Sequence, residues 1–254
     1  MLLLLRTFPI LVALTVIAGS LALFWFPTQP FVVAGLALAL LFILLSRLAD
    51  WNFKKIDAWI LLGIPFLLAV SSFFLLLFLE GNGMKILVIT LATCLIWLFA
   101  ENLFTYLHLP AAYQVNALEY LSLVVNVVSV YFFTTALFAV RLFLSAPLWK
   151  LVPFFALFVF ALTAATFWVC KIEKEKVLVN SLGGTILFCE LFVVFSFLPA
   201  SFFSNAGLLT LFFYLFLGIV RSQLLEKLNK IVLRRYLVTV FIIALLIVWT
   251  ARWT

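Results

Sequence analysis

Apolar runs long enough to cross a bilayer recur from one end of this 254-residue chain to the other, and no other feature constrains the fold as strongly. The hydrocarbon core of a bilayer is about 30 Å thick, so a helix needs about 20 apolar residues to cross it. With 68% of its residues hydrophobic and 10% charged, the chain is typical of a polytopic membrane protein. We therefore predict an all-α fold, an integral membrane helical bundle in a single transmembrane domain over residues 1–254.

Proline, glycine and clusters of charge divide the chain into nine predicted transmembrane helices. Their approximate ranges are 8–26, 31–48, 56–79, 85–107, 115–140, 150–170, 177–198, 206–220 and 236–250. The N-terminal stretch, residues 1–26, resembles a signal peptide, but its only charged residue, Arg6, follows four leucines and no clear cleavage site comes after the apolar run. We interpret it as the first span.

The distribution of lysine and arginine predicts the orientation, with the N-terminus in the cytoplasm and the C-terminus outside. Cytoplasmic loops carry an excess of basic residues in membrane proteins. In this orientation the cytoplasmic side receives Arg6, Arg47, Lys54, Lys55, Lys171, Lys174, Lys176, Arg221, Lys227, Lys230, Arg234 and Arg235. The outer side receives Lys85, Arg141, Lys150 and Arg252. We therefore expect a multi-pass protein of the cell (cytoplasmic) membrane.

Residues 221–235 combine a stripe of leucine, isoleucine and valine with a basic face. This pattern predicts a basic amphipathic segment on the cytoplasmic leaflet, or an extension of the eighth span. Lys227, Lys230, Arg234 and Arg235 are expected to contact anionic lipid headgroups. The expected partners are therefore the lipid bilayer and a second membrane protein. Nucleic acid is excluded because the basic residues lie in clusters between spans rather than along one folded face.

Polar residues form a stripe along each of two neighbouring predicted helices. In range 85–107 and just beyond it, the spacing of three or four aligns Thr90, Thr93, Trp97, Glu101, Thr105 and His108. In range 115–140 it aligns Asn116, Glu119, Ser122, Asn126 and Ser129. Pro110 lies in the short connection, which predicts an antiparallel hairpin with the two stripes facing each other. Counting outward from the turn pairs His108 with Asn116, Thr105 with Glu119, Glu101 with Ser122, Trp97 with Asn126 and Thr93 with Ser129.

Glu190 is predicted near the middle of range 177–198, where no lysine or arginine shares its depth. A carboxylate in hydrocarbon costs on the order of 3 kcal/mol, so we expect Glu190 to be protonated or bonded to a polar group such as Asn126. Gly183 lies seven residues earlier on the same face and is expected to let a neighbouring helix approach closely.

Three functions are consistent with the polar set Glu101, His108, Glu119, Asn126 and Glu190, supported by Trp97, Asn116, Ser122 and Gly183. In the first, hydrogen bonds between helices hold together a non-enzymatic membrane component or assembly partner. In the second, the set forms the path of a small proton- or cation-coupled transporter. In the third, His108 is the base of an enzyme that processes lipid or peptide at the inner leaflet.

The sequence favours the first of these functions. The motifs H-E-x-x-H, G-x-S-x-G and a glycine-rich phosphate loop are absent from the sequence, and one histidine cannot build a histidine-rich metal site. We therefore predict no cofactor and no metal, and the dispersed Cys94, Cys170 and Cys189 predict no disulfide framework. The transporter is the alternative. Nine glycines beside 31 phenylalanines predict a bundle with few hinges, which disfavours it.

Overall fold

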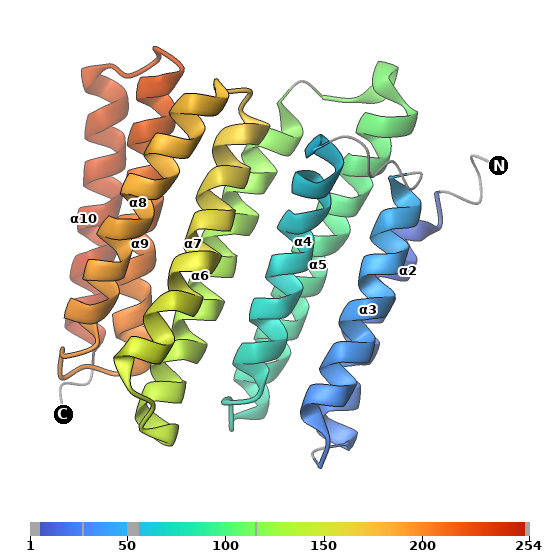
Figure 1. The fold of residues 1–254 in the computed structure, drawn as a ribbon, viewed down its shortest axis with the longest axis horizontal. Helices are drawn as coiled ribbons and strands as arrows, with labels where there is room; N and C mark the ends of the chain where they lie inside the picture. Colours follow the sequence, from blue (N-terminus) through green and yellow to red (C-terminus); the bar gives the residue numbers. More distant parts are fainter. Residues whose placement is uncertain (1–5, 27, 50–55, 115, 252–254) are drawn as a thin grey trace. The chain divides into compact units, whose positions relative to one another are not determined.

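The computed structural model describes residues 6–26, 28–49, 56–114 and 116–251. These residues form nine α-helices, each long and apolar enough to cross a membrane, which confirms the predicted all-α helical architecture (Figure 1). The helices are α2 Phe8–Trp25, α3 Pro30–Leu48, α4 Ile56–Leu76, α5 Asn82–His108, α6 Ala117–Leu144, α7 Leu148–Val169, α8 Lys174–Phe195, α9 Phe202–Leu224 and α10 Lys230–Thr250, with a short 3-10 helix, η1 Pro110–Ala112. The predicted helix start at Val115 and the basic residues Lys54, Lys55 and Arg252 lie outside the described residues.

Several helices begin earlier than the sequence predicts, and polar side chains cap two of them, α9 and α10. At the start of α9 the Ser201 hydroxyl accepts a hydrogen bond from the Ser204 backbone N–H, at 3.2 Å. At the start of α10 the Asn229 side chain accepts one from the Val232 N–H, at 2.8 Å. Each bond satisfies a backbone donor that the first turn of a helix leaves without an intrahelical partner. The polar residues predicted to be loop are therefore the first turns of helices.

The predicted amphipathic segment 221–235 is not a separate helix. Its first residues complete α9, its last residues open α10, and a turn separates them. Glu226 has φ 57°, and the N–H groups of Glu226 and Lys227 bond to the carbonyls of Gln223 and Ser222. These are the two hydrogen bonds of a Schellman motif, which ends a helix. Residues 221–224 therefore continue the preceding helix, α9, and residues 230–235 form the start of α10.

The chain divides into two compact units, residues 1–129 and 130–254. In the first unit, α2 packs against α3 and α5, and α4 packs against α3 and α5. Gly19 of α2 lies at a close approach, because a Cβ there would be 2.6 Å from the Ala37 Cβ and 3.0 Å from the Phe73 ring. The core of this unit is aliphatic and aromatic, and its fully buried side chains include Val12, Leu45, Leu68, Ile96 and Phe99.

Stacked phenylalanine rings form the core of the second unit. The Phe192 ring of α8 stacks on Phe155 of α7, with centroids 4.6 Å apart, and on Phe138 of α6, at 4.8 Å. Phe188, one turn earlier in α8, meets Phe213 and Phe216 of α9 edge to face. Offset and edge-to-face arrangements are the favourable geometries for aromatic pairs. The high phenylalanine content therefore supplies the contacts between α6, α7, α8 and α9.

The last helix of the second unit, α10, packs along one side against α9. Tyr236 of α10 covers Gly218 of α9, and Ile247 of α10 covers Gly207. Only 6% of the membrane-spanning window of α10 is buried, whereas the other spans bury between 28% and 67% of theirs. Among the described spans, α10 therefore contributes least to the core.

Candidate functional site

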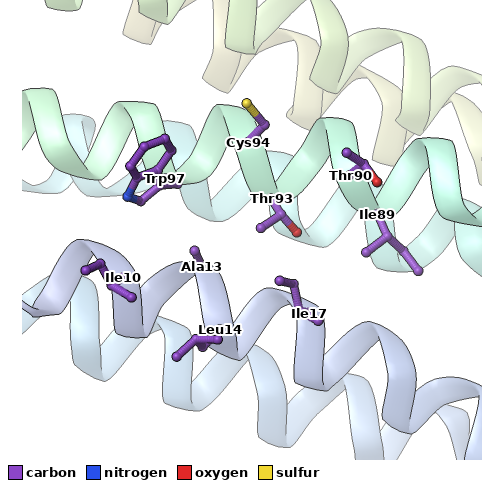
Figure 2. Close-up of a pocket in the computed structure, with 9 residues that line it drawn as sticks. All are labelled: Ile10, Ala13, Leu14, Ile17, Ile89, Thr90, Thr93, Cys94 and Trp97. Atoms are coloured by element: carbon purple, nitrogen blue, oxygen red, sulfur yellow. The ribbon is translucent and has the colours of Figure 1, made fainter.

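The first part of the α5 stripe faces α2. Thr90, Thr93 and Trp97 line an open groove of about 590 Å³ between these two helices (Figure 2). The other lining residues are Ile10, Ala13, Leu14 and Ile17 of α2, and Ile89 and Cys94 of α5. The Thr93 hydroxyl oxygen is buried and has no hydrogen-bond partner among the described residues. Thr93 and Trp97 were predicted to pair with Ser129 and Asn126, so this is a difference from the predicted hairpin.

The rest of the α5 stripe is half-buried, and its hydrogen bonds run along the helix. The Thr105 hydroxyl donates to the Glu101 carbonyl at 2.9 Å. The His108 ring stacks on Phe104, with centroids 5.0 Å apart, and its Nδ1 lies 3.3 Å from the Phe104 carbonyl oxygen. The described residues contain no group of three or more histidine, cysteine or acidic side chains that could hold a metal ion.

The connection from α5 to α6 forms the tight turn that Pro110 predicts. Pro110 begins η1, and the Tyr113 ring packs edge-on against Tyr106 of α5, with centroids 5.1 Å apart. The Tyr113 hydroxyl accepts a hydrogen bond from the Leu118 N–H at the start of α6, at 3.1 Å. Asn116 was predicted within the helical stripe, but it precedes α6 and has φ 66°. Asparagine adopts this left-handed conformation more readily than most residues, which explains its place in the turn.

The hydroxyls of the α6 stripe also donate within their own helix. Ser122 donates to the Glu119 carbonyl at 2.9 Å, and Ser129 donates to the Val125 carbonyl at 2.7 Å. A hydroxyl has a single proton, so neither of these groups can also donate to another helix. Glu119 is half-buried in the first turn of α6, where the helix dipole favours a negative charge, and Asn126 is completely buried.

Glu190 belongs to the second unit and is exposed on α8. Five residues separate it from the end of α8 at Phe195, so it lies nearer that end than the predicted middle. The expected close approach at Gly183 is wrong by one residue. A Cβ at Gly183 would meet no described atom within 4 Å, whereas one at Gly184 would lie 2.6 Å from the Phe216 ring of α9. The predicted site of Glu190 and Asn126 remains a prediction.

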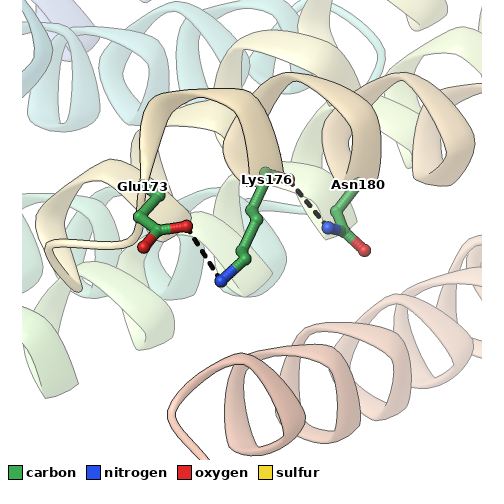
Figure 3. Close-up of polar contacts among 3 residues, drawn as sticks. All are labelled: Glu173, Lys176 and Asn180. Carbon is green, nitrogen blue, oxygen red and sulfur yellow. Dashed lines mark hydrogen bonds and ion pairs between the residues drawn. The ribbon is translucent and has the colours of Figure 1, made fainter.

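Basic residues gather at one end of the second unit, at the start of α8 and around the start of α10. Lys227, Lys230, Arg234 and Arg235 are exposed there. At the start of α8, Lys176 donates to the carboxylate of the N-cap residue Glu173 at 2.8 Å, and the Asn180 amide donates to the Lys176 carbonyl at 2.7 Å (Figure 3). The hydrogen bond from Lys176 and its positive charge lower the pKa of the Glu173 carboxyl below its ordinary value.

The α2 half of the groove is not among the residues that the sequence pattern predicts. Ile10, Ala13, Leu14 and Ile17 recur at three- and four-residue spacing, which places them on one face of a helix. The signal was weak because α2 is apolar on every side, so the spacing does not distinguish this face from the others. The position of the face follows only from the packing of α2 on α5.

A family model described as "Protein of unknown function (DUF5656)" matches residues 52–250, which is more than half of the chain. The chain belongs to this family. The DUF5656 match includes every helix from α4 to α10, while α2 and α3 precede it. The comparisons gave no matching curated protein and no matching solved structure. The family and the nine apolar helices together identify a multi-pass membrane protein of unknown function.

Proposed function

We propose that this protein is a non-enzymatic component of the cytoplasmic membrane, and that it acts as an assembly partner by binding a second membrane protein through α10. The observation that carries the proposal is the small buried share of α10 within its own fold, 6% of the spanning window. The DUF5656 match extends through this helix to residue 250, so α10 is part of the sequence that the family model describes.

The outward face of α10 has the chemistry of a helix-binding surface. Phe241, Leu245 and Val248 recur at helical spacing and are exposed, and Phe241 is 65% exposed. On the opposite face Val240 is only 7% exposed, and Tyr236 and Ile247 pack on glycines of α9. Helices associate in a bilayer through van der Waals packing, so an apolar face of this kind can bind another span.

The hydrogen bonds within the spans support a structural role. The hydroxyls of Thr105, Ser122 and Ser129 donate to carbonyls of their own helices, as do those of Thr163 and Thr166 in the second unit. Serine and threonine can be placed in an apolar helix in this way without an unbonded hydroxyl. These hydroxyl groups of the two stripes are therefore compatible with a packed helix bundle that needs no aqueous path.

The orientation and the lipid contacts form part of the same proposal. We propose an N-terminus in the cytoplasm, so that the basic starts of α8 and α10 lie at the inner leaflet. Lys227, Lys230, Arg234 and Arg235 are exposed and would contact anionic headgroups, each worth about 1 kcal/mol near such a surface. A cysteine introduced at Gln29 tests the orientation, because it should react with an impermeant thiol reagent only from outside the cell.

A photo-crosslinking amino acid tests the α10 surface. Placed at Phe241, it should give a protein adduct of defined mass in native membranes. Placed at Val240, which packs inward, it should give no adduct with another protein. Adducts with lipid alone at position 241 would contradict the assembly proposal.

Flux measurements in proteoliposomes distinguish this proposal from the alternative, a proton- or cation-coupled transporter. A structural component should give no pH-dependent flux in the wild type. Loss of a measurable flux in Glu101→Gln and Glu190→Gln, with folding intact, would favour the transporter instead. His108→Ala tests the third function in the same preparation, because an enzyme that uses His108 as its base would lose turnover of an inner-leaflet lipid.

A further inference from the structure

One face of α8 in the second unit points away from its own fold. Five exposed residues recur on it at steps of three or four: Val179, Gly183, Ile186, Glu190 and Val194. Ile186 is 62% exposed and Val194 is 57% exposed. The opposite side of the helix carries the phenylalanines that pack on α6, α7 and α9, namely Phe188 and Phe192. We call the five exposed residues the α8 face, and it shares no residue with the α10 surface.

Glu190 lies within the membrane-spanning part of α8. The sequence distance from Lys176 to Ser196 corresponds to about 30 Å of helical rise, which matches the thickness of the hydrocarbon core. The Arg141 guanidinium donates to the Ser196 hydroxyl, so a positive charge lies near each end of this length. Glu190 comes about 21 Å of rise after Lys176, and therefore about 9 Å inside the nearer end.

Glu190 forms no ion pair and no hydrogen bond with the residues that the structure describes. One turn away on either side, its neighbours on the α8 face are the apolar Ile186 and Val194. The Arg141 guanidinium is already bound to the Ser196 hydroxyl and lies over the Phe197 ring, 4.8 Å from its centre. A charged side chain in hydrocarbon is costly unless a second charge pairs with it. The group that would neutralise Glu190 must therefore come from outside the described part of the chain.

Gly183 leaves space on the same face for another helix. A Cβ atom at Gly183 would meet no described atom within 4 Å, whereas the space beside Gly184, on the inner side, is filled by the Phe216 ring of α9. Gly183 and Glu190 are two turns apart, about 10 Å of rise. Small residues let the backbones of two membrane helices approach closely. The α8 face therefore offers one neighbouring helix both a close approach and a negative charge.

We propose that the α8 face binds a membrane-spanning helix of another protein that carries a lysine or arginine at the depth of Glu190. A basic side chain there pairs with the carboxylate, so that neither charge is left alone in hydrocarbon. A second copy of this chain does not supply that charge, because a two-fold interface of α8 faces brings one Glu190 against the other. A lipid acyl chain has no positive charge at this depth. The inference rests on the proposed assembly function and names the chemistry of the partner, but it uses a different surface from α10.

Model helices of defined sequence test this chemistry in the full-length protein. The purified protein, with a photo-crosslinking amino acid at Ile186, is reconstituted into vesicles together with a tryptophan-flanked peptide of about 20 leucines, long enough to cross the bilayer. One peptide carries a lysine about 9 Å of rise from one end, a second carries a glutamate at the same position, and a third keeps the leucine. We expect the lysine peptide to form several-fold more adduct at Ile186 than the other two.

Variants of the α8 face separate the effect of charge from that of shape. Glu190→Gln should remove the preference for the lysine peptide, and Glu190→Lys should reverse it in favour of the glutamate peptide. Glu175→Gln is the matched control, because it removes an exposed carboxylate from the first turn of the same helix and should leave the preference unchanged. Gly183→Leu fills the close approach and should lower the adduct yield with all three peptides. Glu190 and Gly183 are exposed, so thermal unfolding in detergent should be similar in every variant.

Several outcomes would overturn the proposal. Equal adduct yields from the lysine and leucine peptides would do so, as would a lysine preference that persists in Glu190→Gln. Adducts at Ile186 between two copies of the chain, formed in place of peptide adducts, would show that a second copy covers this face instead. The result is distinguishable from the α10 test. Lipid adducts alone at Phe241 would leave the lysine preference at Ile186 intact, and loss of that preference would leave protein adducts at Phe241 intact.

Discussion

The ring of Tyr236 in α10 occupies the space that a Cβ atom on Gly218 in α9 would need. The Tyr214 ring lies beside it, with centroids 5.4 Å apart, and limits how far the Tyr236 ring can move. Glycine at this position therefore determines how closely the last two helices pack.

Gly218→Ala should loosen the attachment of α10. The added methyl overlaps the Tyr236 ring, and overpacking of this kind typically costs about 1–3 kcal/mol. Thermal unfolding in detergent should show a lower midpoint, and hydrogen exchange should rise in α10. Gly183→Ala is the matched control, because its Cβ meets no described atom within 4 Å and alanine stabilises a helix by up to about 1 kcal/mol relative to glycine. Equal destabilisation by both substitutions would contradict the close approach at Gly218.

Phe192→Ala should destabilise the second unit, because it removes a ring that stacks on both Phe155 and Phe138. Phenylalanine-to-alanine changes in packed cores cost about 3–5 kcal/mol in water. In a bilayer the value should fall toward about 2 kcal/mol, since helices there gain packing contacts but little hydrophobic stabilisation. Phe154→Ala, on the exposed face of α7, is the control and should be nearly neutral. The free energy of unfolding in mixed micelles measures both.

The Arg141 guanidinium at the end of α6 donates to the Ser196 hydroxyl after α8, and it lies over the Phe197 ring, 4.8 Å from the ring centre. Arg141→Ala should increase hydrogen exchange and proteolysis of the turn from α8 to α9. Arg141→Lys should protect this turn only partly, because the lysine ammonium is not flat and cannot stack on an aromatic ring as a guanidinium does. The ammonium of Lys150 lies over the ring of its neighbour Trp149, so Lys150→Ala should leave this turn unchanged.

Glu173 should titrate below the ordinary glutamate pKa of about 4.3. In the folded protein, Lys176 lowers the pKa of the Glu173 carboxyl below its value in the unfolded chain. The ion pair therefore stabilises the fold at pH values above the unfolded-state pKa, and this stabilisation is lost as the pH falls through the lowered pKa of the folded state. Both side chains are exposed, so high salt should weaken the effect. Carboxyl chemical shifts of labelled glutamate measure the titration. Lys176→Met should return the Glu173 pKa toward its ordinary value, and an unchanged pKa would exclude the pair.

The spans were predictable from sequence because each is a long apolar run, and their number and order are confirmed in the described residues. The ends of the helices were less predictable, because a polar residue at a membrane boundary can either cap a helix or lie in the loop outside it. Ser201 and Asn229 cap helices, and Glu226 ends one in a left-handed conformation that glycine more often adopts.

The arrangement of the polar residues was harder to predict for two physical reasons. Spacing identifies which residues share a helix face, but it does not identify the helix that covers that face. For this reason Thr93 and Trp97 were assigned to the wrong neighbour. Spacing also cannot show that Ser122 and Ser129 donate to their own backbone carbonyls, because that choice depends on the side-chain rotamer.

The one-sided attachment of α10 has a consequence for how the protein is made. With a mean hydropathy of 2.4, this helix is apolar enough to insert into a bilayer without support from the rest of the chain. Packing of α10 on α9 is then a separate step. It depends on the contacts of Tyr236 and Ile247 in α10 with Gly218 and Gly207 in α9. A chain that has inserted every span can therefore still lack this final interface between α9 and α10.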